Sequence, residues 1–173
     1  MKKIIKNGKV YDGISDKIKQ QDVLITDGVI TDVGNIDISD GDIEIIDASN
    51  YIVSPGFIDI HSHLREPGYE YKETIATGTR AASKGGFTTI CAMPTTIPAL
   101  DSKDSIDYFK DLCKQRSIIK VHPIGAVTIN RKGKEIVEMQ SLVDSGVIGF
   151  SDDGEPIHDS NIMRMSLEYS KMV

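Results

Sequence analysis

Residues 55–68 read PGFIDIHSHLREPG, and this stretch decides how the rest of the chain is interpreted. Phe57 to Ile60 form a short apolar run typical of a buried strand, and the run leads directly into His61 and His63. Side chains two residues apart on a strand point the same way, so both imidazoles can reach one metal ion. A His-x-His pair also arises by chance, but its position at the end of a buried strand favours a metal site.

After this stretch, apolar β-branched runs alternate with helical patterns, and such alternation predicts a parallel sheet. A doubly wound sheet is an alternative, but no GxGxxG motif follows any strand. A (β/α)8 barrel needs about 250 residues, so residues 55–173 fit the first half of a barrel, with four strand-helix pairs. The expected strands are 57–60, 87–93, 118–127 and 147–150, and the expected helices are 73–84, one capped by Asp101 or Ser102, one around 136–143, and one from Asp159 or Ser160 to the terminus.

Residues 1–54 follow a different pattern, with short apolar runs separated by turns. Strands are expected near residues 4–11, 23–30 and 43–46, and Asp27-Gly28 predicts a hairpin within the second of these. We therefore expect residues 1–54 to form a small antiparallel unit, the N-terminal part of a β-sandwich, followed by the half-barrel.

The composition excludes several classes of function. The chain has 173 residues, of which 39% are hydrophobic and 27% charged, and its net charge of −6 argues against nucleic-acid binding. No apolar stretch approaches the roughly 20 residues of a membrane span, and the N-terminus lacks the apolar core of a signal peptide. Cys91 and Cys113 have neither CxxC spacing nor the density of a disulfide scaffold, so a reducing cytoplasm is expected.

Reactive groups of α/β barrels lie at the carboxyl ends of the strands, and we look there for polar and charged side chains of this chain. Thr95 follows the second strand, and the pair Asp152-Asp153 follows the fourth. One of these carboxylates could complete a metal site or bridge two ions, while the other is a turn or capping residue. Arg65 can hold a carboxylate through two hydrogen bonds; the alternative is a surface salt bridge.

These residues resemble the signature of class I dihydroorotases, in the amidohydrolase superfamily. The match begins with residues 55–68 and extends over the whole chain, continuing in family order through GTRAA (78–82), GGFTT (85–89), MPTTIP (93–98) and SDDG (151–154). The resemblance implies a zinc-dependent enzyme that reversibly cyclises N-carbamoyl-L-aspartate to dihydroorotate in pyrimidine biosynthesis. In the hydrolytic direction, metal-activated water would attack the ring amide while the metal polarises the carbonyl.

The resemblance also implies a ligand set. One or two zinc ions would be bound by His61, His63 and Asp153, with Asp152 the less favoured member of the aspartate pair. His63 would also contact the substrate. The family's general acid-base and its remaining metal histidines are expected beyond the end of this sequence. The chain is therefore interpreted as an N-terminal fragment that is inactive alone.

Arg65 and Thr95 bear on the substrate. By resemblance, Arg65 would hold the α-carboxylate of the substrate. Thr95 stands where the family usually has an asparagine that binds this carboxylate. A hydroxyl is shorter than an amide and lacks its second polar atom, which puts selectivity for dihydroorotate in question.

Three alternatives remain open. Another cyclic-amide hydrolase, a dihydropyrimidinase (hydantoinase) or allantoinase, would share the His-x-His pair but typically lacks arginine at the position of Arg65. A non-catalytic dihydroorotase-like scaffold for aspartate transcarbamoylase usually loses the histidines. A free-standing half-barrel module would leave open sheet edges. The expected partners are thus a small-molecule substrate and either a second copy or aspartate transcarbamoylase, with no nucleic acid or membrane.

Overall fold

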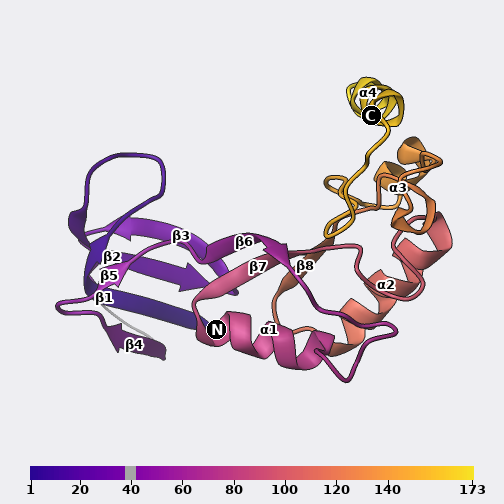
Figure 1. Ribbon diagram of the computed structural model, residues 1–173. Coiled ribbons are helices and arrows are strands. Elements are labelled where there is room, and N and C mark those ends of the chain that lie inside the picture. Colours follow the sequence, from indigo (N-terminus) through magenta and orange to yellow (C-terminus); the bar gives the residue numbers. More distant parts are fainter. Residues whose placement is uncertain (38–41) are drawn as a thin grey trace. The chain divides into compact units, whose positions relative to one another are not determined.

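A computed structural model describes residues 1–37 and 42–173, which form two compact units, Met1–Pro55 and Gly56–Val173 (Figure 1). Strands build the first unit, and strands alternating with helices build the second. The fold is therefore α/β, as the sequence predicts.

The described residues of the first unit form one five-stranded sheet, whose main path runs in the order β3-β2-β1-β4. Antiparallel β2 and β3 make the predicted hairpin, in which Asp27 and Gly28 have φ of 50° and 81°. Positive φ at both central residues is the requirement of a type I′ turn, which Asp-Gly meets at little cost. The strands are β1 (Lys2–Val10), β2 (Lys19–Thr26), β3 (Val29–Gly34), β4 (Ile43–Asp47) and β5 (Ile52–Val53).

One feature of this unit corrects the sequence prediction. Both β4 and β5 run parallel to β1, so the sheet is mixed rather than antiparallel. The described residues of the unit form a single sheet, and the expectation that it is part of a β-sandwich stays a prediction. Alternating apolar residues reveal a strand, but they carry no information about its direction.

The second unit contains the predicted parallel sheet, in the order β6-β7-β8. Its strands are β6 (Phe57–Ser62), β7 (Phe87–Ala92) and β8 (Lys120–Pro123). The helices α1 (Ile75–Lys84) and α2 (Lys103–Arg116) connect them and pack against β7 and β8 respectively (Figure 1). Each strand is thus followed by a helix, the arrangement that brings the carboxyl ends of parallel strands to one edge.

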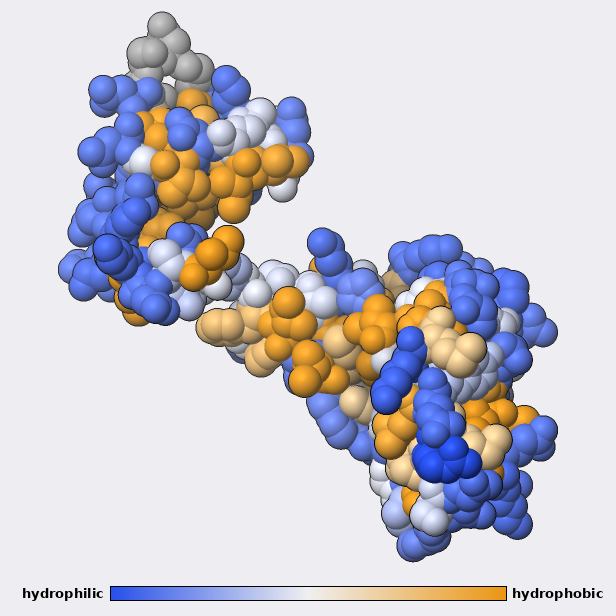
Figure 2. Space-filling view, turned by 90° about the horizontal axis from the view of Figure 1, so that it is seen from above, coloured by the Kyte–Doolittle hydropathy of each residue, from blue (hydrophilic) through white to orange (hydrophobic). Residues whose placement is uncertain are grey.

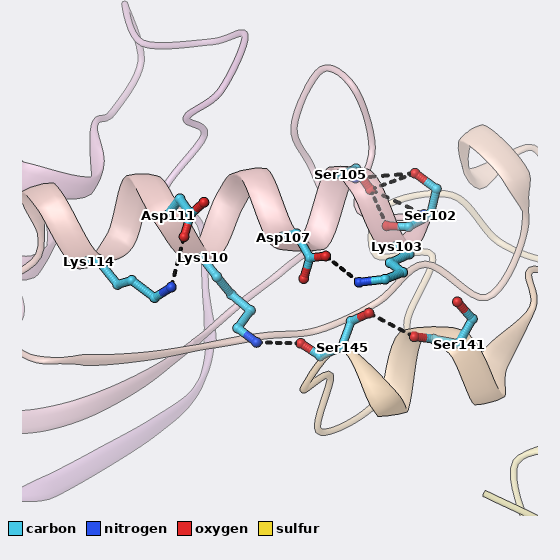
Figure 3. Close-up of polar contacts among 9 residues, drawn as sticks. All are labelled: Ser102, Lys103, Ser105, Asp107, Lys110, Asp111, Lys114, Ser141 and Ser145. Atoms are coloured by element: carbon cyan, nitrogen blue, oxygen red, sulfur yellow. Dashed lines mark hydrogen bonds and ion pairs between the residues drawn. The ribbon is translucent and has the colours of Figure 1, made fainter.

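The predicted Ser102 cap of α2 is present, and the helix has an apolar face. The Ser102 hydroxyl accepts from the Ser105 amide at 3.3 Å, and the Ser105 hydroxyl accepts from the Ser102 amide at 3.2 Å (Figure 3). Ile106 and Phe109 are buried in the core of the unit. On the other side of α2, the Lys110 ammonium donates to the Ser145 carbonyl at 2.6 Å and so ties α2 to the segment after α3 (Figure 3).

The last third of the chain departs from the prediction. Residues 147–150 make only one parallel bridge, Gly125 to Phe150, instead of a fourth strand. Pro123 ends β8 and has no N–H to donate to a further strand, which limits the ladder. Helix α3 (Met139–Asp144) begins later than expected, and α4 (Ser160–Tyr169) ends before the terminus. The predicted Asp159 cap of α4 is confirmed, and Gly146, with φ of 95°, follows the end of α3.

Large apolar side chains lie on the surface of both units, as the orange areas of Figure 2 show. In the second unit Phe57, Ile58 and Ile60 of β6 are 57%, 63% and 74% exposed, and Leu167 of α4 is 57% exposed. In the part of the chain that the structure describes, no helix is long and apolar enough to span a bilayer.

Candidate metal centre

The end of β6 presents two imidazoles beside one another. The Ser62 hydroxyl, between the two histidines, donates to the Cys91 carbonyl of β7 at 2.9 Å. Because side chains alternate along an extended chain, His61 and His63 share the opposite side. Their ring centroids are 5.3 Å apart.

A carboxylate from another part of the unit completes this group. Asp153 approaches both histidines, with Oδ1 3.0 Å from His61 Nε2 and Oδ2 3.4 Å from His63 Nε2. In the described residues this is the one His/Cys/Asp/Glu group with metal-ligand spacing, its three ligand atoms lying within 4.8 Å of one another. Zinc bonds of about 2.0–2.2 Å at tetrahedral angles place ligand atoms roughly 3.3 Å apart. The group therefore fits a zinc ion in donor type and spacing.

The neighbouring aspartate has a different environment. Asp152 is buried, and its Oδ1 accepts hydrogen bonds from the amides of Val127 and Thr128 at 2.8 and 3.0 Å. Its Oδ2 accepts from the Thr128 hydroxyl. The structure thus places Asp153 with the histidines, whereas Asp152 anchors its loop to the segment after β8.

Thr95 lies behind His63. It is 4% exposed, and its hydroxyl is 2.8 Å from Nδ1 of His63, the ring nitrogen that does not face Asp153. When Nε2 binds a metal, Nδ1 carries the ring proton and donates a hydrogen bond to the Thr95 hydroxyl. Thr95 thereby orients the ring, a role that the sequence did not indicate.

Burial and nearby charges lower the pKa of His63. Burial has the largest effect, and the Arg65 guanidinium comes next. The carboxylate of Asp153 opposes them and raises the pKa, while His61 and Arg131 lower it further. The shift favours the neutral imidazole, which is the form that binds metals.

Arg65 is held between two buried neighbours. It has a φ of 61°, and Leu64 and Glu66 on either side of it are 2% and 1% exposed. The carboxylate of Glu66 accepts from the amide of Ile75 at 2.8 Å and forms an ion pair with Arg116 at the end of α2. Glu66 therefore fixes the backbone that presents Arg65 near His63, and sequence reasoning overlooked it because a lone Glu in a loop reads as solvated.

Sequence reasoning also missed Arg131. Its Nη1 donates to the backbone carbonyl of Asp153 at 2.9 Å. The only local signals were Asn130 and Gly133, residue types that tolerate the left-handed conformation of an irregular loop.

This chain is similar to known proteins over most or all of its length. The family model described as dihydro-orotase-like matches residues 50–172. A dihydroorotase of Pelotomaculum thermopropionicum is 44% identical over 173 residues, and one of Caldanaerobacter subterraneus subsp. tengcongensis is 47% identical over 173 residues. These alignments cover 100% and 99% of this chain. The chain spans only about 40% of the length of these relatives.

Solved structures extend the similarity to another group of enzymes. A D-hydantoinase (dihydropyrimidinase) from Thermus sp. is similar with a TM-score of 0.78 and 28% identity, over 98% of this chain and 38% of that one. An L-hydantoinase from Arthrobacter aurescens is similar with a TM-score of 0.74 and 28% identity, over 86% of this chain and 32% of that one.

Proposed function

Because this chain belongs to the dihydro-orotase-like family, we propose that it is the N-terminal part of a zinc-dependent dihydroorotase. The reaction would be the reversible cyclisation of N-carbamoyl-L-aspartate to dihydroorotate, a step of pyrimidine biosynthesis in the cytoplasm. The observation that carries the proposal is the group formed by His61, His63 and Asp153, with Arg65 close enough to lower the pKa of His63.

The residues of this chain have separate tasks in the proposed reaction. His61, His63 and Asp153 hold one or two zinc ions, which when bound supply activated water and polarise the ring carbonyl. Arg65 binds the substrate carboxylate and keeps its charge in a partly dry site. His63 and Thr95 complete the substrate side, with Thr95 also orienting the His63 ring.

We further propose that Gly56–Val173 is the first half of a (β/α)8 barrel and that the remaining part of a longer protein completes it. Three parallel strands with intervening helices support this proposal, as do the exposed apolar side chains of β6. A hollow of about 900 Å³ beside α3 and α4 has apolar walls that include Phe150 and Leu167. Asp152 and Asp153 are among its lining residues, whereas His61, His63 and Arg65 are not, so we assign most of the hollow to packing against further chain.

The second candidate is a hydantoinase-type activity on uncharged cyclic amides. The similarity to hydantoinase structures and the presence of Thr95 favour it. Arg65 favours dihydroorotate, because a guanidinium that faces an uncharged ring would lose hydration without gaining a carboxylate partner.

Substrate comparison tests the assignment. The purified full-length protein, loaded with zinc, is assayed with dihydroorotate, N-carbamoyl-L-aspartate, hydantoin and allantoin. We expect turnover of the first two and little of the others. Preferential turnover of hydantoin or allantoin would replace the assignment by the second candidate or by an allantoinase. A protein that neither binds zinc nor turns over any of the four would be a scaffold, whose expected partner is aspartate transcarbamoylase. The mass of the purified enzyme in solution then shows whether it is a homo-oligomer.

A further inference from the structure

Arg131 has an unfavourable local environment next to the candidate metal centre. Its φ is 55°, and Asn130 before it has a φ of 53°. Left-handed backbone is costly for a long side chain such as arginine, and such strain gathers at functional sites. In addition, Nε of Arg131 is buried and, among the described residues, has no hydrogen-bond partner.

Contacts of the surrounding loop hold Arg131 in this conformation. The Asn130 amide donates to Asp101 at 2.7 Å, and the Gly133 amide donates to the Thr128 hydroxyl at 2.8 Å. Thr128 is in turn bound to Asp152 through its amide and its hydroxyl. The loop is therefore fixed on both sides of Arg131 by hydrogen bonds that do not involve the Arg131 side chain.

Those contacts direct the guanidinium to the metal-binding aspartate. Nη1 of Arg131 donates to the Asp153 carbonyl at 2.9 Å, while the Asp153 amide donates to the Ser151 hydroxyl at 3.0 Å. Both polar groups of the Asp153 backbone are thus engaged on the protein side. Its carboxylate is left free to face the two imidazoles at 3.0 and 3.4 Å.

We propose that Arg131 is a positioning residue that holds the backbone of Asp153 so that its carboxylate meets the ion bound by His61 and His63. The inference rests on the proposed zinc site and adds to it a residue outside the ligand set. Groups that orient metal ligands commonly raise metal affinity 10- to 100-fold. Arg131 contacts the main chain of Asp153. The position of that main chain determines where the Asp153 side chain begins.

Zinc affinity of the full-length protein tests the proposal, measured by competition with a chromophoric chelator. We expect Arg131→Gln to weaken zinc binding about 10- to 100-fold, and Arg131→Lys to recover much of the loss because it keeps a charged donor. Lys132→Gln is the matched control, since it removes an exposed charge from the next position of the same loop. Asn130→Gly relieves the backbone strain at the left-handed residue before Arg131 and should leave zinc affinity unchanged.

The outcomes separate this proposal from the function on which it rests. If the unaltered protein binds zinc and Arg131→Gln binds it equally well, the positioning role is wrong and the metal site stands. If Lys132→Gln weakens binding as much as Arg131→Gln, a general charge effect replaces the proposal. If the unaltered protein binds no zinc, both the proposal and the proposed function are wrong. Urea unfolding of each variant without metal shows that the comparison is made on folded protein.

Discussion

Adjacent aspartates with opposite tasks give a sharp prediction, because Asp152 and Asp153 differ in environment and not in chemistry. Asp152 accepts hydrogen bonds from two backbone amides and one hydroxyl at a buried position. Leaving a buried donor unsatisfied costs about 1–3 kcal/mol, and these costs are not additive. We therefore expect Asp152→Ala to lower the free energy of unfolding by about 3–5 kcal/mol, and Asp152→Asn, which keeps one acceptor oxygen, to lower it less.

The corresponding changes at Asp153 should affect metal binding instead. Its carboxylate faces the imidazoles, so Asp153→Asn should leave the metal-free protein about as stable as before while zinc is lost. The assay is urea unfolding of the full-length protein after chelation, followed by zinc titration of each folded variant. An Asp152→Ala protein with unchanged stability and weakened zinc binding, or the reverse pattern at Asp153, would refute the division of roles.

Four further predictions concern the site and the fragment. Arg65→Gln should reduce turnover of dihydroorotate far more than that of hydantoin, because losing the charged hydrogen bond to a buried carboxylate costs about 2–5 kcal/mol of binding free energy. Equal losses on both substrates contradict the carboxylate role. Thr95→Val keeps the side-chain shape but removes the hydrogen bond to His63, so zinc affinity should fall about 10- to 100-fold, and an unchanged chelator competition argues against it. Removing the Arg65 charge should also raise the pKa of His63, so that in Arg65→Gln the NMR titration of His63 and the onset of zinc binding both move to higher pH. Residues 1–173 expressed alone should show no turnover with added zinc. The general acid-base residue is expected in the remaining part of the longer protein, and its assistance is worth about 10²–10⁴-fold in rate. Activity matching the full-length protein would refute the fragment interpretation.

The sequence predicted those features that local chemistry determines. The Asp27-Gly28 turn, the Ser102 cap and the strand that leads into His61 each depend on residues within a few positions of one another. Strand direction was wrong for β4, because pairing with β1 depends on a distant partner. The strand expected at 147–150 failed for a similar reason, since its ladder would have required an N–H at Pro123.

The candidate site shows the same limit. The histidine pair is visible as a spacing, and Asp153 was preferred over Asp152 only through family resemblance. The environment that distinguishes Asp152 from Asp153 depends on the amides of Val127 and Thr128, some 25 residues earlier in the chain. Glu66 and Arg131 were missed because their contacts, with Ile75 and Asp153, join segments that no local pattern connects.

The central claim is that His61 and His63 hold a zinc ion, and metal analysis tests it most directly. The full-length protein and its His61→Ala/His63→Ala variant are purified in parallel, equilibrated with zinc, freed of excess metal and analysed by atomic absorption. The account predicts bound zinc in the unaltered protein and its loss in the double variant, with both proteins folded. An unchanged zinc stoichiometry in the double variant would contradict it.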